Sequence, residues 1–132
     1  MSWKIVYHEE RPESPKVGDM WPAPWLVKDV DGSGKLREFF LSDKFILDWN
    51  AKLVTRMPLV VRLPGATGVT DFCVDGPCFS NGKRETSGWA VSGTAPRITV
   101  MPSINIVGSY HGWIRDGVIT DDCEGRKLPQ GQ

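Results

Sequence analysis

Short segments rich in β-branched and aromatic residues alternate with glycine and proline along most of the chain. This pattern predicts a mainly β fold, a β-rich α+β domain of compact antiparallel sheets or hairpins arranged like a sandwich or a barrel. The expected strands are 3–7, 25–29, 35–41, 59–63, 69–74, 89–94, 97–101, 104–107, 110–115 and 118–122.

One segment, 42–53, has a helical rather than a strand pattern. Ser42 suits the N-cap position, and Asp43 places a negative charge in the first turn, where the helix dipole favours it. The apolar residues that share one helical face are Phe45, Ile46, Trp49 and Leu53. We therefore expect one short helix in an otherwise β protein.

Glycine-containing turns and proline-rich stretches predict the connections. Asn81-Gly82 and Asp116-Gly117 are strong hairpin signals, because a type I′ turn needs positive φ at both central residues, and 30–34 suits a hairpin connection too. The polar, proline-broken stretch 8–24 is expected to be a surface arm or loop, and 124–132 a flexible C-terminal tail. The 132 residues are enough for a single domain, 1–132.

Charge and composition narrow the function classes. Sixteen basic and sixteen acidic residues balance, so the chain carries no strong signal for nucleic acid, and no apolar run approaches the roughly 18 residues of a membrane span. The three cysteines form an odd set, which favours free thiols or metal ligands over a disulfide framework. The start of the chain does not resemble a secretory signal, so we expect an intracellular setting.

The Asp116-Gly117 turn fixes a register for the strands on either side of it. A two-residue loop places His111 opposite Asp122, close enough for the carboxylate to accept a hydrogen bond from the imidazole and orient it. The alternation sends Ile114 and Ile119 to the core, with Tyr110 on their side. The candidate binding residues are Trp113, Arg115, Thr120 and Tyr110.

A serine is the best candidate nucleophile for that histidine. Ser103 follows Pro102, where the strand is expected to be interrupted. A three-residue loop at 106–108 pairs Ser103 with His111, whereas a two-residue loop at 108–109 pairs it with Ile114; both registers stay open. The alternative reading of His111 and Asp122 is a surface cross-strand ion pair without catalytic function.

A zinc site is a second interpretation. It would use Cys73, Cys78, His111 and Cys123 as a Cys3His ligand set. The four-residue spacer between the first two cysteines is long for structural zinc, so free thiols are favoured over a metal.

The segment 96–123 resembles a family of small bacteriophage and bacterial proteins catalogued as a domain of unknown function. The resemblance is carried by Pro102-Ser103-Ile104, His111, Trp113-Ile114, Asp116-Gly117 and Asp122-Cys123. It implies a phage or prophage origin and singles out the same serine, histidine and aspartate. Many members have cysteine where Tyr110 stands and a second histidine in the stretch where this chain reads 124–126. These departures weaken a metal site more than a serine, histidine and aspartate site.

The sequence therefore leaves two main hypotheses and one lesser one. The first is a phage-type serine hydrolase or peptidase, with Ser103 as nucleophile, His111 as base and Asp122 as orienting acid, and no cofactor. The second is a non-enzymatic accessory protein, a virion component or an inhibitor of a host protein, which docks through the Trp- and Pro-rich N-terminal third, around Trp21 and Trp25. The third is the zinc-binding domain. We expect a protein or peptide partner, no membrane association, and a location in the bacterial host cytoplasm or the virion.

Overall fold

The computed structural model describes residues 1–27, 35–80, 82–85 and 88–129 and is mainly β, as the sequence predicts. The strands are β1 (Trp3–Lys4), β2 (Val6–Tyr7), β3 (Asp19–Pro22), β4 (Leu59–Leu63), β5 (Thr70–Cys73), β6 (Cys78–Ser80), β7 (Lys83–Glu85), β8 (Ala90–Thr94), β9 (Arg97–Ile106), β10 (Tyr110–Arg115) and β11 (Val118–Ile119). The helices are the 3-10 turns η1 (Pro24–Leu26) and η2 (Glu38–Phe40) and the α-helix α1 (Asp43–Asn50).

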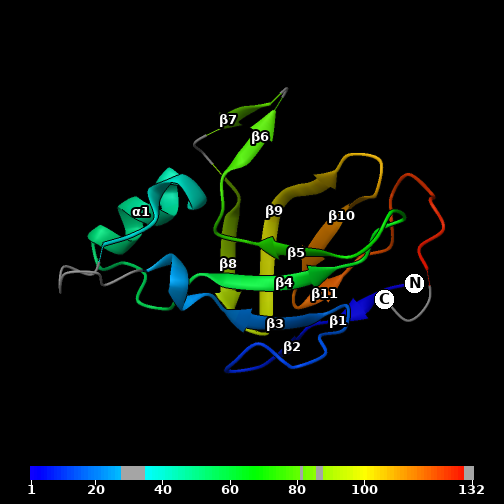
Figure 1. Cartoon of the computed structure of the whole chain (residues 1–132), viewed down its shortest axis with the longest axis horizontal. Coiled ribbons are helices and arrows are strands. Elements are labelled where there is room, and N and C mark those ends of the chain that lie inside the picture. Colours follow the sequence, from blue (N-terminus) through cyan, green and yellow to red (C-terminus); the bar gives the residue numbers. More distant parts are fainter. Residues whose placement is uncertain (28–34, 81, 86–87, 130–132) are drawn as a thin grey trace.

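Two open sheets pack face to face. One has the strand order β1-β11-β10-β9-β8 and the other β2-β3-β4-β5, in which β2 and β3 run parallel and the remaining pairs antiparallel. Figure 1 shows β3, β4 and β5 crossing β8 and β9 at a steep angle, as in orthogonally packed sheets. A single apolar cluster joins them, with Ile98, Val100 and Ile114 from one sheet and Val61 and Phe72 from the other.

The predicted strand 3–7 is divided between the two sheets. β1 pairs with β11 and β2 with β3, and the buried Ile5 lies between them with its N–H donating to the Gly117 carbonyl. The prediction of a surface arm over 8–24 is wrong for residues 19–22. These form β3, in which Met20 and Trp21 are buried, because the apolar pair occupies a central position of the four-stranded sheet.

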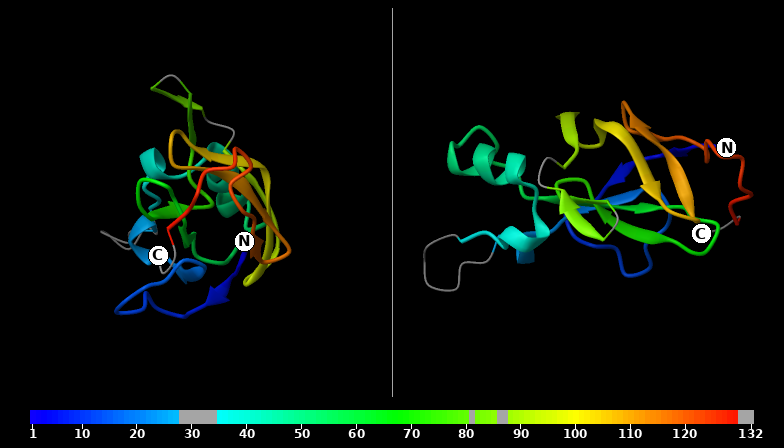
Figure 2. Two further views of the ribbon diagram at one scale, coloured as in Figure 1. Left: turned by 90° about the vertical axis from the view of Figure 1, so that its right-hand side faces the viewer. Right: turned by 90° about the horizontal axis from the view of Figure 1, so that it is seen from above.

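A second apolar cluster covers the outer face of the four-stranded sheet. It contains Trp21 and Val60 from the sheet and Leu26, Leu41 and Phe45 from the covering segments. Figure 2 shows α1 at one end of the layered sheets. Both faces of β4 are therefore buried, which suits its nearly continuous apolar sequence.

The helix begins as predicted and ends earlier. The Ser42 hydroxyl accepts a hydrogen bond from the Phe45 N–H at 3.1 Å, which confirms the N-cap. The helix stops at Asn50, and Leu53, expected on its apolar face, is 78% exposed because Lys52 takes a positive φ of 58° and turns the chain away.

Strand β9 is continuous through Pro102, where an interruption was expected. Its pairing with β10 shifts between Gly112 and Ile114, so that 101–103 lie opposite Trp113 alone. This bulge accommodates the proline within the strand.

The Asp116-Gly117 hairpin is confirmed, with Arg115 opposite Val118. Ser80 pairs with Lys83, although Asn81 of that turn lies outside the described residues, as does the expected hairpin connection 30–34. The tail is less free than expected: Arg126 binds Asp122, and Leu128 packs in the main core. None of the helices in the described ranges has the length and hydropathy needed to cross a membrane.

Candidate functional site

Ser103 and His111 meet on the outer face of the five-stranded sheet. Ser103 lies on β9 and His111 on the neighbouring β10. The serine Oγ lies 3.0 Å from the imidazole Nε2, within hydrogen-bonding distance. The histidine side chain is 26% exposed, so the pair is open to solvent on one side.

The contact is diagonal rather than directly cross-strand. The connecting loop is 107–109, with Ile106 opposite Tyr110, so His111 faces Asn105. Both predicted registers are therefore wrong. The loop has three residues, as in the first prediction, but it starts one residue later. Ser103 still reaches His111, because residues two positions apart on a strand share a face and diagonal neighbours lie within side-chain reach.

The imidazole faces a different carboxylate from the one predicted. Its Nδ1 lies 3.6 Å from Glu124 Oε2, and the Glu124 carboxylate also accepts from Arg126 Nη2. Asp122 Oδ1 instead accepts from the backbone N–H of His111 at 2.8 Å, so the predicted contact of Asp122 with the imidazole is wrong.

The displacement of Asp122 has a local cause. The ladder between β10 and the chain after β11 slips by one residue, and the N–H that donates to the His111 carbonyl is that of Cys123, not Asp122. In a regular ladder the Asp122 carbonyl would accept from the His111 N–H. Here the Asp122 side chain accepts that hydrogen bond instead. Asp122 thus holds the backbone of His111, while Glu124 faces its ring.

The charge of Asp122 is stabilised by its partners. Its side chain is buried, which alone would raise its pKa, but the backbone N–H groups of Arg126 and His111 and the Arg126 guanidinium outweigh burial and lower that pKa. The carboxylate therefore stays ionised and keeps its hydrogen bonds at neutral pH.

Aromatic and cationic side chains extend from His111 along β10. The Trp113 ring stacks on the imidazole with centroids 6.0 Å apart, and the Arg115 guanidinium lies 4.8 Å above the Trp113 ring. The Thr120 hydroxyl accepts from the Trp113 N–H at 2.9 Å. Trp113 and Arg115 thus share the face of His111, as the alternation predicts.

Tyr110 does not belong to this surface. It is fully buried, its hydroxyl donates to the Thr120 carbonyl at 2.8 Å, and burial raises its pKa to about 12. The prediction that Tyr110 is a binding residue is therefore wrong. Gly112 is required beside it, because a Cβ there would collide with the Tyr110 hydroxyl.

Ser103, His111 and Glu124 are arranged as a nucleophile, a base and a carboxylate partner would be. An imidazole that accepts the serine proton at Nε2 presents Nδ1 to Glu124, which stabilises the imidazolium that forms. Sequence reasoning missed Glu124, because it lies past the end of the strand, where a ladder register no longer places side chains.

The structure does not assemble the predicted zinc ligands. Cys73 ends β5 and Cys78 begins β6, whereas His111 and Cys123 lie at the other sheet. Among the described residues no group of three or more metal-ligating side chains is found.

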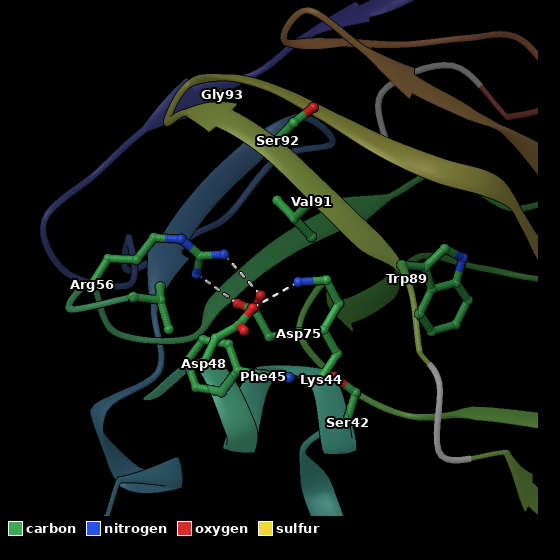
Figure 3. A pocket seen from close by; sticks show the side chains of 11 residues that line it. Ser42, Lys44, Phe45, Asp48, Arg56, Asp75, Trp89, Val91, Ser92 and Gly93 are labelled. Atoms are coloured by element: carbon green, nitrogen blue, oxygen red, sulfur yellow. Dashed lines mark hydrogen bonds and ion pairs between the residues drawn. The ribbon is translucent and has the colours of Figure 1, made fainter. Parts of the chain in front are cut away.

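A separate cavity of about 190 Å³ lies between α1 and β8 (Figure 3). Its buried Asp75 accepts two hydrogen bonds from Arg56, at 2.7 and 2.8 Å, and one from the Leu59 N–H. Lys44 and Asp48, which also line the cavity, form an ion pair one turn apart on α1. These charges are matched within the cavity: Arg56 and Asp75 join the loop before β4 to the turn after β5, and Lys44 and Asp48 pair on α1 itself.

No protein-family model, no curated protein and no solved structure matches this chain.

Proposed function

We propose that this protein is a serine-type hydrolase with Ser103 as nucleophile, His111 as general base and Glu124 as the carboxylate that faces the imidazole. The observation that carries this proposal is the 3.0 Å contact between Ser103 Oγ and His111 Nε2, with Glu124 on the other ring nitrogen at 3.6 Å. A serine hydroxyl is a weak nucleophile unless a base takes its proton, and the position of His111 Nε2 supports this role.

The reaction would follow the acyl-enzyme route. Ser103 Oγ attacks the carbonyl carbon of an ester or amide while His111 Nε2 takes its proton, and the imidazolium then protonates the leaving alcohol or amine. In the second half water attacks the acyl-serine and gives a proton to His111, which passes it to Ser103 Oγ as the acid product leaves. Asp122 acts as a positioning residue, since it holds the backbone N–H of His111.

The experiment is labelling of the purified protein with a fluorophosphonate, with the adduct mapped by mass spectrometry. We expect modification at Ser103 that is lost in Ser103→Ala and in His111→Ala. Ser92→Ala is the matched control, because Ser92 is an exposed serine on the adjacent strand β8. Folded wild-type protein that remains unmodified would overturn the proposal.

A negative result would favour the rival hypothesis, a non-enzymatic accessory protein. Trp21 is only 1% exposed, so a docking surface in the N-terminal third would have to rely on residues such as Trp25, which is 50% exposed. The phage origin that the C-terminal resemblance implies stays a prediction, as does a place in a host cytoplasm or a virion.

A further inference from the structure

An apolar cleft of about 280 Å³ lies on the outer face of the four-stranded sheet. Its floor is one cross-strand row, in which Trp21 on β3 pairs with Val60 on β4 and Val60 with Cys73 on β5. Trp21 and Val60 are largely buried at this floor, and side chains of η1 and η2 line the cleft above it. Ser103 and His111 lie on the other sheet, so the cleft is independent of the proposed hydrolase site.

The walls of the cleft are aromatic. Trp25 of η1 and Phe40 of η2 line it, and each is 50% exposed although both are large apolar side chains. Burial raises the pKa of the Cys73 thiol to about 12, so this side chain stays protonated and uncharged at neutral pH. Small-molecule sites typically combine such a lining with a few polar groups that fix orientation.

Arg11 places a positive charge at the cleft. The Arg11 guanidinium lies 5.6 Å from the Trp21 ring centroid, and within the described part of the chain it forms no ion pair. The carboxylate of Asp71, also in the lining, is already paired with Arg62 through contacts of 2.8 and 3.3 Å. Among the described residues that line the cleft, Arg11 is thus a cation whose charge no ion pair uses.

We propose that the cleft binds a small aromatic carboxylate, with its ring against Trp25 and Phe40 and its acid group on the Arg11 guanidinium. A guanidinium presents a planar fork of donors that matches a carboxylate, and the Arg11 guanidinium lies over the Trp21 ring at the floor of the cleft. The aromatic walls contribute affinity by burying the ring, and the arginine selects for the anion.

The test is a titration followed by amide and indole N–H signals in NMR spectra, with phenylacetate as the probe and neutral phenylacetamide as its isostere. We expect saturable shifts at Trp25, Val60 and Cys73, and phenylacetate to bind about tenfold or more tightly than phenylacetamide, as a charge-assisted hydrogen bond requires. Arg11→Gln should remove this preference. Arg37→Gln, an exposed arginine outside the lining, should retain it.

Two results would overturn the proposal. Equal affinity of wild type for the acid and the amide would mean that the cleft does not recognise the carboxylate. Absence of shifts at millimolar phenylacetate would mean that the cleft does not admit the ring. Because Arg11 is exposed, its substitution should leave the fold intact, and the unchanged spectrum of the variant outside the cleft checks this.

Discussion

The outer faces of the two sheets differ in what lies on them. The outer face of the five-stranded sheet carries Ser103, His111, Trp113 and Arg115, and the histidine keeps 26% of its side chain exposed. The outer face of the four-stranded sheet carries an apolar row that helix and 3-10 segments cover in a second cluster.

The difference suggests that the covered face contributes to stability and the open face to the proposed reaction. An apolar sheet face must be covered, and the cover contributes to the core. A polar sheet face needs no cover, so its side chains are free to meet one another and solvent. Substitutions on the covered side should therefore act on folding, and substitutions on the open side on reactivity.

The largest stability effect is expected from Asp75→Ala, beneath the cover of the four-stranded sheet. The change leaves the buried Leu59 N–H and the 31% exposed Arg56 side chain without their shared acceptor, which costs about 3 kcal/mol of unfolding free energy. Asp71→Ala is the control, since the 38% exposed Asp71 side chain and Arg62 form a surface pair worth about 0–1 kcal/mol. Equal losses in urea unfolding would contradict this difference.

A smaller loss is expected from Gly112→Ala in β10. The added methyl would collide with the Tyr110 hydroxyl, and overpacking of this kind costs about 1–3 kcal/mol. Tyr110→Phe in the same chain should recover part of the loss, because it removes the hydroxyl. A double-mutant cycle by thermal unfolding measures the coupling, and strict additivity would rule out this collision as the cause.

Ser42→Ala should cost about 1 kcal/mol, because the helix that covers the four-stranded sheet loses its N-cap. Ser92→Ala on the exposed edge strand β8 should change the free energy of unfolding by less than about 0.5 kcal/mol. If both variants unfold at the same denaturant concentration as wild type, the cap does not stabilise the cover.

The smallest effect on stability is expected from Asp122→Asn, next to the five-stranded sheet, and it should depend on pH. Because the folded pKa of Asp122 is lowered, its ionised form stabilises the fold at pH values above the unfolded value of about 3.9, and this contribution fades as the pH falls below it. Unfolding temperatures of wild type and Asp122→Asn should therefore converge below about pH 4. A constant difference from pH 7 to pH 3 would show that the charge is not involved.

The sequence predicted the β-rich fold, the Ser42 cap and the Asp116-Gly117 hairpin because each depends on neighbouring residues. It missed β3, since Met20-Trp21 is a short apolar pair whose strand character comes from pairing with distant β4. The split of the first strand at Ile5 likewise depends on two sheets that local patterns do not describe.

The candidate site was predicted in part for the same reason. The alternation in β10 placed His111, Trp113 and Arg115 on one face, and their ring contacts follow that face. Which carboxylate faces the imidazole, Asp122 or Glu124, depends on a one-residue slip after Ile119 and on a turn held by Arg126. Counting residues outward from the hairpin turn predicts neither.

The most direct test of the central claim is the second-order rate constant for fluorophosphonate modification of Ser103, compared between wild type and His111→Ala. Activation by His111 Nε2 predicts a rate constant at least about 100-fold higher in wild type, the usual contribution of a positioned base. Equal rate constants in two folded proteins would show that Ser103 is an ordinary surface serine and that the proposed hydrolase site is wrong.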